Sequence, residues 1–262
     1  MNVKAVVKVM NFHALLRVEA SGQQALMYST MEEELSAMMQ ILQSNRNLRL
    51  DKHIRLPDKS LPVLRIYLGS DLGFCGSVNT SVSSVLQHDD AQTEKIVIGR
   101  KLRRPAQVSL YLSQDEYQQN FGKVRDYLEQ AVRQRRWSAV EVVYNHYYNV
   151  TSVKQETKRI YPLAAPQEDA AALNEWDDFE IEGDAQRLLE DMTISCLVYE
   201  VRIAAASAYA SENIMRQNAT SESLKKLDEI EAETARVQRK EKNQTSFRKT
   251  IDSFIKQKSL QR

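Results

Sequence analysis

The stretch LEDMTISCLVYEVRIAAASAYA, residues 189–210, decides the fold of this chain. Its apolar side chains recur at alternating steps of three and four residues, without a break along the whole stretch. This spacing is that of a coiled-coil seam, in which one narrow edge of a helix packs against a second helix. Neighbouring alanine and serine residues permit a close approach of the two helices. The seam consists of Leu189, Met192, Cys196, Tyr199, Ile203, Ala206 and Ala210.

The helix that carries this seam is predicted to extend far beyond it. Residues 184–262 contain no Gly and no Pro, the two residues that most readily end a helix. A helix over this range would be roughly 120 Å long, so it must project from a domain of this size. Beyond Val237 the seam fails, because residues 238–246 include no apolar residue. One last apolar stripe follows at Phe247, Ile251, Phe254 and Ile255.

The N-terminal end of the chain has the same character. Residues 1–56 contain a single Gly, Gly22, and no Pro, and residues 3–48 are predicted to be helical. A narrow apolar stripe packs against one other helix, and both ends start from the same middle region. The sequence therefore predicts an antiparallel coiled coil of the N- and C-terminal helices. The N-terminal stripe has two parts, Val3, Val7, Met10 and Ala14, and then Ala25, Tyr28, Leu35, Met39 and Leu42.

The middle of the chain is predicted to be a small α/β domain. β-rich runs at 61–68, 95–99, 108–112 and 139–148 alternate with helical patterns at 79–87 and 114–137. Such alternation with short connections is typical of βαβ units and a parallel sheet. The predicted fold class is therefore α/β with long helical ends. We expect an N-terminal coiled-coil helix at 1–56, a Rossmann-like α/β domain at 57–165, an acidic loop or foot at 166–183 and a C-terminal coiled-coil helix at 184–262.

The composition excludes several classes of protein. Lys and Arg number 36 against 35 Asp and Glu, so the overall charge favours neither nucleic acid nor an acidic substrate. Two cysteines make no disulfide framework and no metal-binding spacing. No apolar run is long enough to span a membrane. Acidic residues gather at 164–191 and basic ones at 236–262, a pattern of solvated surface or of two ends that meet different partners.

The sequence contains no catalytic constellation. The loop GSDLGFCG at 69–76 follows a strand and precedes a helix, which is where α/β folds bind phosphate. It matches neither GxGxxG nor a P-loop, so we interpret it as a structural turn. No histidine is paired with Cys75 by its sequence context, and a buried thiol is the better interpretation. We expect no catalytic residue, no metal and no cofactor on this chain.

Several short segments resemble the gamma subunit of F-type ATP synthases. Residues 70–79 (SDLGFCGSVN) resemble that family's SDRGLCGGFN block, and Ile98-Gly99-Arg100-Lys101 resembles its GxK turn. Residues 143–147 resemble its YN-containing strand, residues 176–180 its W-x-Y-E stretch, and Ala210-Ser211-Glu212-Asn213 with Ala219-Thr220 its ASEN and AT elements. Their order is that of the family, from about residue 61 to 220. The resemblance marks Ser70, Asp71, Gly73, Cys75, Gly76 and Asn79 as a structural motif.

The chain also departs from the family pattern. Leu72 stands where the family has Arg, and Ser77 breaks its second Gly pair. The N-terminal helix lacks the usual basic start and the IT-x-AM element. Residues 238–245 keep only Gln244 of the family's RQAAITQE. These departures indicate a divergent or paralogous gamma subunit.

The resemblance implies the central rotor stalk of a proton- or sodium-transporting two-sector ATPase. As a non-catalytic subunit, it would couple ion flow through the c-ring to ATP synthesis or hydrolysis in the ring of alpha and beta subunits. The implied partners are the alpha and beta subunits, the epsilon subunit and the c-ring, with no nucleic acid. The implied location is peripheral, at the cytoplasmic face of the inner or plasma membrane.

Contacts with these partners are assigned to the helical ends and to the foot. Residues 1–20 and 236–258 would meet the alpha–beta ring, and residues 42–50 and 176–183 the c-ring. The ring residues are Arg236, Arg239, Lys240, Lys242, Gln244, Phe247 and Ile251, and the foot residues are Trp176, Phe179, Glu180 and Glu182. Two alternatives stay open: a gamma-like adaptor or shaft of a different hexameric ATPase motor, and a stand-alone α/β enzyme that binds nucleotide at 69–76.

Overall fold

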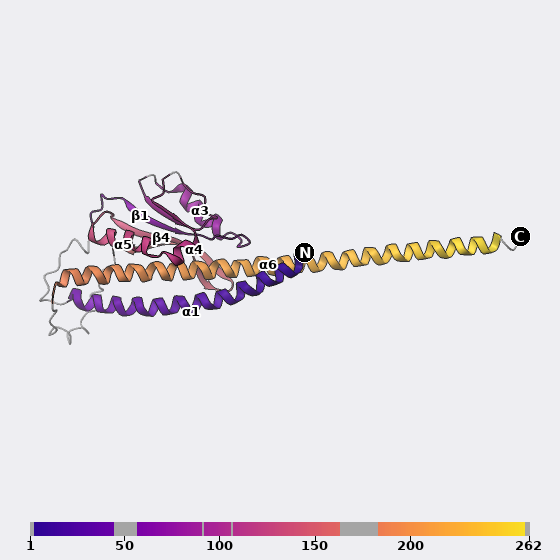
Figure 1. Ribbon diagram of the computed structural model, residues 1–262, viewed down its shortest axis with the longest axis horizontal. Helices are drawn as coiled ribbons and strands as arrows, with labels where there is room; N and C mark the ends of the chain where they lie inside the picture. The colour runs from indigo at the N-terminus through magenta and orange to yellow at the C-terminus, as the bar shows by residue number, and fades with distance from the viewer. Residues whose placement is uncertain (1–2, 45–56, 91, 106, 163–182, 260–262) are drawn as a thin grey trace.

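Two long helices dominate the computed structural model, which describes residues 3–44, 57–90, 92–105, 107–162 and 183–259. Helix α1 spans Val3–Ser44 and helix α6 spans Ala185–Ser259. They lie side by side along the length of α1, after which α6 continues alone to the C-terminal end (Figure 1). With 75 residues, α6 is about 110 Å long at 1.5 Å per residue.

The two helices run in opposite directions. Near the start of α1, the Lys4 ammonium lies 2.6 Å from carboxylate oxygens of both Asp228 and Glu231 of α6. Near the end of α1, the Thr193 hydroxyl of α6 donates a hydrogen bond to the sulfur of Met39. The predicted antiparallel pairing of the two ends of the chain is therefore confirmed.

The face of α1 that meets α6 follows the predicted stripe from Val7 to Met39, while the side chain of Leu42 lies outside the described residues. Val3 is 64 % exposed, because the contact face at this end passes through Lys4 instead. Val18 and Ser21, both buried, join the two parts of the stripe into one face. The buried or half-buried positions step by three or four residues at Lys4, Val7, Met10, Ala14, Val18, Ser21, Ala25, Tyr28, Glu32, Leu35 and Met39.

The middle of the chain folds into a five-stranded sheet with the order β3-β2-β1-β4-β5. β1 pairs in parallel with β2 and β4, and β2 pairs in parallel with β3. These four strands form the predicted parallel sheet. Their bounds are Val63–Leu68 for β1, Glu94–Ile98 for β2, Leu110–Leu112 for β3 and Ala139–Asn149 for β4.

The fifth strand makes the sheet mixed. β5 (Ser152–Tyr161) pairs antiparallel with β4 through a tight turn at 150–151. The Asn149 side chain caps this turn, since its Oδ1 accepts a hydrogen bond from the backbone nitrogen of Thr151 at 2.9 Å.

Helices cover both faces of the sheet. On one face lies α3 (Val78–His88), with Val82 and Leu86 packed against Tyr67, Val97 and Val143. On the other face lie α5 (Gly122–Arg133) and the first part of α6, and α1 lies outside α6 (Figure 1). The main core therefore forms between the sheet and the α5–α6 layer.

Helix α6 is buried on two faces rather than one. The predicted seam faces α1, and a second stripe packs into the main core with α5 and the sheet. The second stripe consists of Ile194, Leu197, Val201 and Ala204. This double burial explains why α6 needs no strongly one-sided apolar face in its first half.

The helix predicted at 114–137 is divided in two. α4 (Gln114–Gln119) begins with a capping box, in which Ser113 Oγ accepts from the Glu116 nitrogen and Glu116 Oε2 accepts from the Ser113 nitrogen. Asn120 leaves the helical conformation at φ −126° and ψ 48°, and α5 starts at Gly122. The apolar periodicity crosses the break, because Tyr117 and Phe121 still pack toward the same core.

A buried carboxylate ties three strands together. Glu141 of β4, 6 % exposed, accepts from Arg65 Nε of β1 at 2.7 Å and from Arg159 Nη2 of β5 at 2.8 Å. Burial alone would raise the pKa of Glu141, but the hydrogen bonds and charges of the two arginines outweigh it. The pKa is therefore lowered from its usual 4.5.

This lowered pKa predicts an acid-dependent loss of stability. Glu141 contributes fully above pH 4.5, the unfolded value, and its contribution is lost as the pH falls through the lower folded value. We expect E141Q to lower the free energy of unfolding at neutral pH and to flatten its decline toward acid, measured by urea denaturation across a pH series. E129Q, at an exposed pair with Arg133, should keep the wild-type slope. Equal slopes for E141Q and wild type would contradict this.

Candidate functional site

The loop between β1 and α3, residues 69–79, is closed by its own side chains. Asn79 Oδ1 accepts from the Ser70 backbone nitrogen at 2.9 Å, and Asn79 Nδ2 donates to Ser70 Oγ at 2.7 Å. The same amide nitrogen lies 3.2 Å from the sulfur of Cys75. Ser70 and Cys75 are both buried, so these three side chains fix the loop from within.

Asp71 connects this loop to the two loops that follow β2 and β3. Its Oδ1 accepts from the Arg100 backbone nitrogen at 2.8 Å, and its Oδ2 accepts from the Gln114 backbone nitrogen at 3.0 Å. The Gln114 side chain returns the contact by accepting from the Asp71 nitrogen at 3.3 Å. One carboxylate thus fastens the carboxyl ends of three adjacent strands to one another.

Two glycines permit close approaches that other residues would block. Gly76 has φ +56°, and a Cβ there would lie 2.7 Å from the Cε of Met215 on α6. Gly99 has φ +115°, and its Cβ would lie 2.6 Å from the carbonyl carbon of Gly69. The left-handed region favours glycine at both positions. The loop therefore packs directly against α6 and against the turn after β2.

A buried polar cluster on α6 receives this loop. Arg216 forms an ion pair with Glu212, donates to Asn213 Oδ1 at 3.0 Å and donates to the carbonyl oxygen of Gly73 at 3.3 Å. Gln114 Nε2 donates to Glu212 Oε2 at 2.7 Å. The side chains of Glu212 and Arg216 are nearly inaccessible to solvent, at 2 % and 5 % exposed. We call Glu212, Asn213 and Arg216 the anchor cluster, because it joins α6 to two loops of the sheet domain.

A second link starts from Ser211, the residue directly before Glu212 on α6. Ser211 Oγ donates to the backbone carbonyl of Asn145 in β4 at 2.8 Å. The Asn145 side chain in turn donates to the carbonyl of Val78 at 3.0 Å and accepts from Ser81 Oγ at 2.9 Å. Helix α6, β4 and α3 are thereby connected at the carboxyl edge of the sheet, where β1 and β4 diverge.

These contacts use the groups that a phosphate would need. The Ser70 and Asp71 amides already donate to Asn79 and Gln114, and the Glu212 carboxylate lies behind the loop. A bound anion would have to displace internal hydrogen bonds and approach a buried negative charge. The loop is thus built as a joint to α6, as the interpretation of a structural turn expects.

The sequence patterns did not single out the anchor cluster as a site. Glu212 and Asn213 were noted only as part of the ASEN element, and Arg216 and Gln114 were not noted at all. One signal was available: buried polar residues follow the end of the apolar seam, and Asn213, Arg216 and Thr220 continue its steps of three and four residues. The whole set is Ser211, Glu212, Asn213, Arg216 and Thr220. Polar residues at seam positions are expected to pair with one another or with loop backbone.

The named ring residues, from Arg236 to Ile251, lie on the part of α6 that no other described segment accompanies (Figure 1). Residues 3–20, also assigned to the ring, lie on α1 in the part that is paired with α6. From Glu231 to residue 253 every described side chain of α6 is exposed. The helix continues unbroken through the polar stretch 238–246. The exposed set includes Arg236, Arg239, Lys240, Lys242, Gln244, Phe247 and Ile251.

The exposed C-terminal part of α6 carries a narrow row of side chains at regular spacing. Ile230, Val237, Gln244 and Ile251 follow one another at seven-residue steps, which places them along one side of the helix. The three apolar members are 59 %, 49 % and 42 % exposed. Large exposed apolar side chains in a row indicate a surface that another protein covers.

The residues assigned to the foot, Trp176, Phe179, Glu180 and Glu182, lie outside the described residues, as does most of 42–50 and 163–182. In the part of the chain that is described, no group of three His, Cys, Asp or Glu side chains could hold a metal ion. Within the same residues, no helix combines the length and the apolarity needed to cross a bilayer.

Comparison with known proteins gives a family match along nearly the whole chain. A family model described as ATP synthase matches residues 1–246. A search of curated proteins finds no match to the chain.

Solved structures share the fold. The central stalk of Tetrahymena thermophila mitochondrial ATP synthase, from a central stalk/c-ring structure, has a TM-score of 0.56 at 17 % identity, covering 83 % of this chain and 99 % of that one. A chain of the Euglena gracilis mitochondrial ATP synthase has a TM-score of 0.50 at 16 % identity, covering 93 % of each chain. The family match and the paired-helix architecture agree. This chain belongs to the ATP synthase family as a gamma subunit, the non-catalytic central stalk of an F-type ATP synthase.

Proposed function

We propose that this chain transmits torque between a c-ring and a ring of alpha and beta subunits. The observation that carries the proposal is the continuity of α6, which runs from the anchor cluster on the sheet domain to an unaccompanied end in one helix. A rotation applied to the sheet domain can reach the far end only through this helix. The solved structures with the same fold come from a central stalk/c-ring assembly and from an OSCP/F1/c-ring assembly, which supports this arrangement.

The asymmetry of the shaft gives the mechanism. A single off-centre rod inside a ring of identical sites contacts each of them differently at any moment. The binding free energies of those sites then differ according to the orientation of the rod, which is a coupling free energy carried by a rigid element. ATP chemistry takes place in the ring, and this chain couples it to ion flow through the c-ring.

The alpha–beta ring contact is assigned to residues 1–20 and 236–258. Exposed arginine and lysine side chains on the free end of α6 would meet carbonyl and carboxylate groups that line the bore, and the edge at Ile230, Val237 and Ile251 would meet apolar ones. This assignment rests on exposure, charge and the absence of a partner for α6 there within the described residues.

Charge reversal tests this contact. We expect Arg239→Glu, Lys240→Glu and Lys242→Glu together to lower ATP-driven rotation or coupling by about tenfold or more, since three favourable pairings become repulsive. Reversal at the exposed Lys101, Arg103 and Lys123 of the sheet domain makes the same change in net charge and should leave ring function near wild type. The ring contact is wrongly placed if the first triple variant couples normally.

The foot is proposed to comprise residues 42–50 and 176–183, with Trp176, Phe179, Glu180 and Glu182 facing the c-ring and the epsilon subunit. The division of the chain at 56, 165 and 183 is part of this proposal. The chain would then lie peripherally at the cytoplasmic face of the inner or plasma membrane. Deletion of 176–183 should weaken docking to the membrane sector while retaining the alpha–beta contact.

Affinity purification of the tagged full-length chain tests the whole proposal. Co-purification of alpha, beta and epsilon subunits with the c-ring is expected. A different hexameric ATPase without any c-ring subunit would instead support the alternative of a gamma-like adaptor or shaft for another motor, which the divergence at Gln238–Thr245 keeps open.

A further inference from the structure

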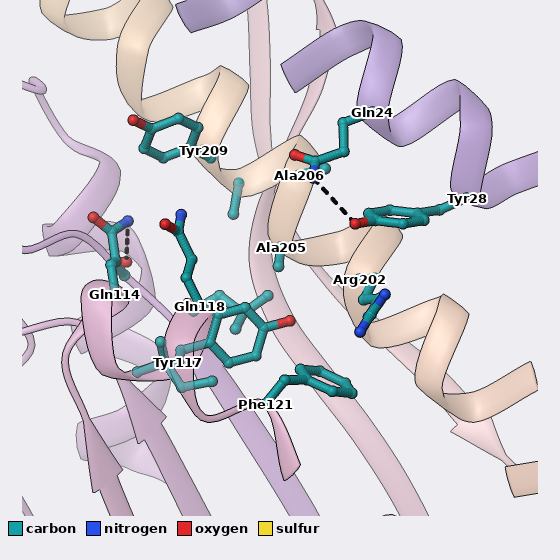
Figure 2. A pocket seen from close by; sticks show the side chains of 14 residues that line it. Gln24, Tyr28, Gln114, Tyr117, Gln118, Phe121, Arg202, Ala205, Ala206 and Tyr209 are labelled. Carbon is teal, nitrogen blue, oxygen red and sulfur yellow. Dashed lines mark hydrogen bonds between the residues drawn. The ribbon is translucent and has the colours of Figure 1, made fainter. Parts of the chain in front are cut away.

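A cavity of about 380 Å³ lies between the shaft and the sheet domain, apart from the anchor cluster. Its floor is formed by Leu68 and Ile98, at the carboxyl ends of β1 and β2. The α4–α5 turn forms one wall, α6 forms the other, and α1 contributes Gln24 and Tyr28 at the rim (Figure 2). Its size is that of a site for a small organic molecule.

The sequence makes this cavity by placing small residues opposite large ones. Ala205, Ala206 and Ala208 of α6 line it, and Figure 2 shows Ala205 and Ala206 on the side opposite Tyr117 and Phe121. The break between α4 and α5 removes the turn of helix that would otherwise fill this corner of the core. The apolar and aromatic surfaces form the floor and part of both walls, and Gln24, Gln114, Gln118 and Arg202 make the rest of the lining polar.

One positive charge lies at the cavity without a negative partner. The Arg202 guanidinium lies 4.7 Å from the ring centre of Phe121 and 5.5 Å from that of Tyr28, stacked between the two. Among the described residues, no carboxylate is within ion-pair distance of Arg202, and no Asp or Glu lines the cavity. Stacking leaves the edge of the guanidinium free for a bidentate acceptor.

A buried hydroxyl at the same place also has no partner. The Tyr117 hydroxyl oxygen is inaccessible to solvent and has no hydrogen bond among the described residues. Figure 2 shows it on the side of the ring toward Arg202. Burial raises the pKa of Tyr117, so the hydroxyl keeps its proton and can donate. Buried polar groups are nearly always paired, which makes an unpaired donor beside an unpaired cation a sign of a missing acceptor.

We propose that this cavity binds a small aromatic carboxylate. The carboxylate accepts hydrogen bonds from Arg202 and Tyr117, and the ring lies among Phe121, Leu68 and the alanines of α6. A phosphate is a poorer match, because it would bring a second negative charge to a single arginine above an apolar floor. The proposal does not depend on the role of the chain as a rotor shaft.

Binding of benzoate to the purified full-length chain tests the proposal, with benzamide as the neutral isostere. Ligand-observed NMR should give saturable binding of benzoate, with benzamide weaker by about tenfold or more, as expected for loss of a charged pair. Arg202→Gln should abolish the preference for benzoate, and Tyr117→Phe should weaken benzoate several-fold.

Arg125 supplies the matched control. It lies on the adjoining groove between α5 and α6, which shares Arg202 and Phe121 with the cavity but lies outside it. Arg125→Gln should therefore bind benzoate as the wild type does. Equal binding of benzoate and benzamide, an equal loss in Arg125→Gln and Arg202→Gln, or no binding at millimolar benzoate would each overturn the proposal. The first comparison uses only the wild-type chain, so it stands even where a variant fails to fold.

Discussion

Replacing Arg216 by methionine is expected to lower the free energy of unfolding by about 3–5 kcal/mol, the usual result of breaking a buried ion pair from one side. The variant leaves the Glu212 carboxylate buried with only Gln114 to hold it. It also removes the donors to Asn213 and to the carbonyl of Gly73. The loop at 69–79 would lose its charged contact with α6, so the attachment of the sheet domain should loosen as well.

The measurement is urea denaturation followed by circular dichroism and tryptophan fluorescence. Lys226→Met is the matched control, since Glu222 and Lys226 have the same spacing on the same helix as Glu212 and Arg216. Their side chains are 68 % exposed, so solvent screens the pair and its contribution to stability is small. Similar losses in the two variants would mean that the anchor cluster contributes no more than a surface pair.

Replacing Lys240 by proline is expected to uncouple the motor while leaving the rest of the fold intact. Proline in a helix interior costs about 3 kcal/mol or more and kinks the helix. Lys240 is exposed and lies nine residues beyond Glu231, where Lys4 at the start of α1 contacts α6. The damage should therefore stay local, yet it divides α6, the one helix among the described residues that reaches the far end.

The readout is ion pumping per ATP hydrolysed in the reconstituted complex, with a loss of about tenfold or more expected for the proline variant. Lys240→Ala is the control, because alanine removes the charge and keeps the helix. Near-normal coupling with alanine and loss of coupling with proline would show that the continuity of α6, and not the Lys240 charge, is required. If the proline variant pumps normally, torque does not pass through this part of α6.

Much of the architecture follows from local periodicity. The seam from Leu189 to Ala210 and the absence of Gly and Pro after Gly183 are enough to predict a long paired helix, because both are properties of contiguous sequence. The second buried stripe of α6 is harder to recognise. Its residues lie between those of the seam, so in the sequence the two stripes read as one broad apolar surface. They become two separate faces only because the sheet and α5 pack against one of them and α1 against the other.

The joint between shaft and sheet domain depends on contacts that no sequence window contains. Arg216 meets the carbonyl of Gly73 across a separation of 143 residues, and Gln114 meets Glu212 across 98. The loop residues could be recognised as a motif, but the residues that receive them could not. The division of α4 from α5 was missed for a different reason, since Tyr117 and Phe121 keep their spacing across a break that the Asn120 backbone makes.

The start of α1, where Lys4 lies beside Asp228 and Glu231, also has a mechanical consequence. A pair of packed helices resists bending and twisting more strongly than one helix, because material is placed away from the common axis. Past this point α6 has no second described helix beside it, so it would twist more readily than the paired part. Part of the energy of each catalytic step would be stored there as elastic strain. The sheet domain at the other end of the shaft would then turn more evenly than the stepwise chemistry of the ring.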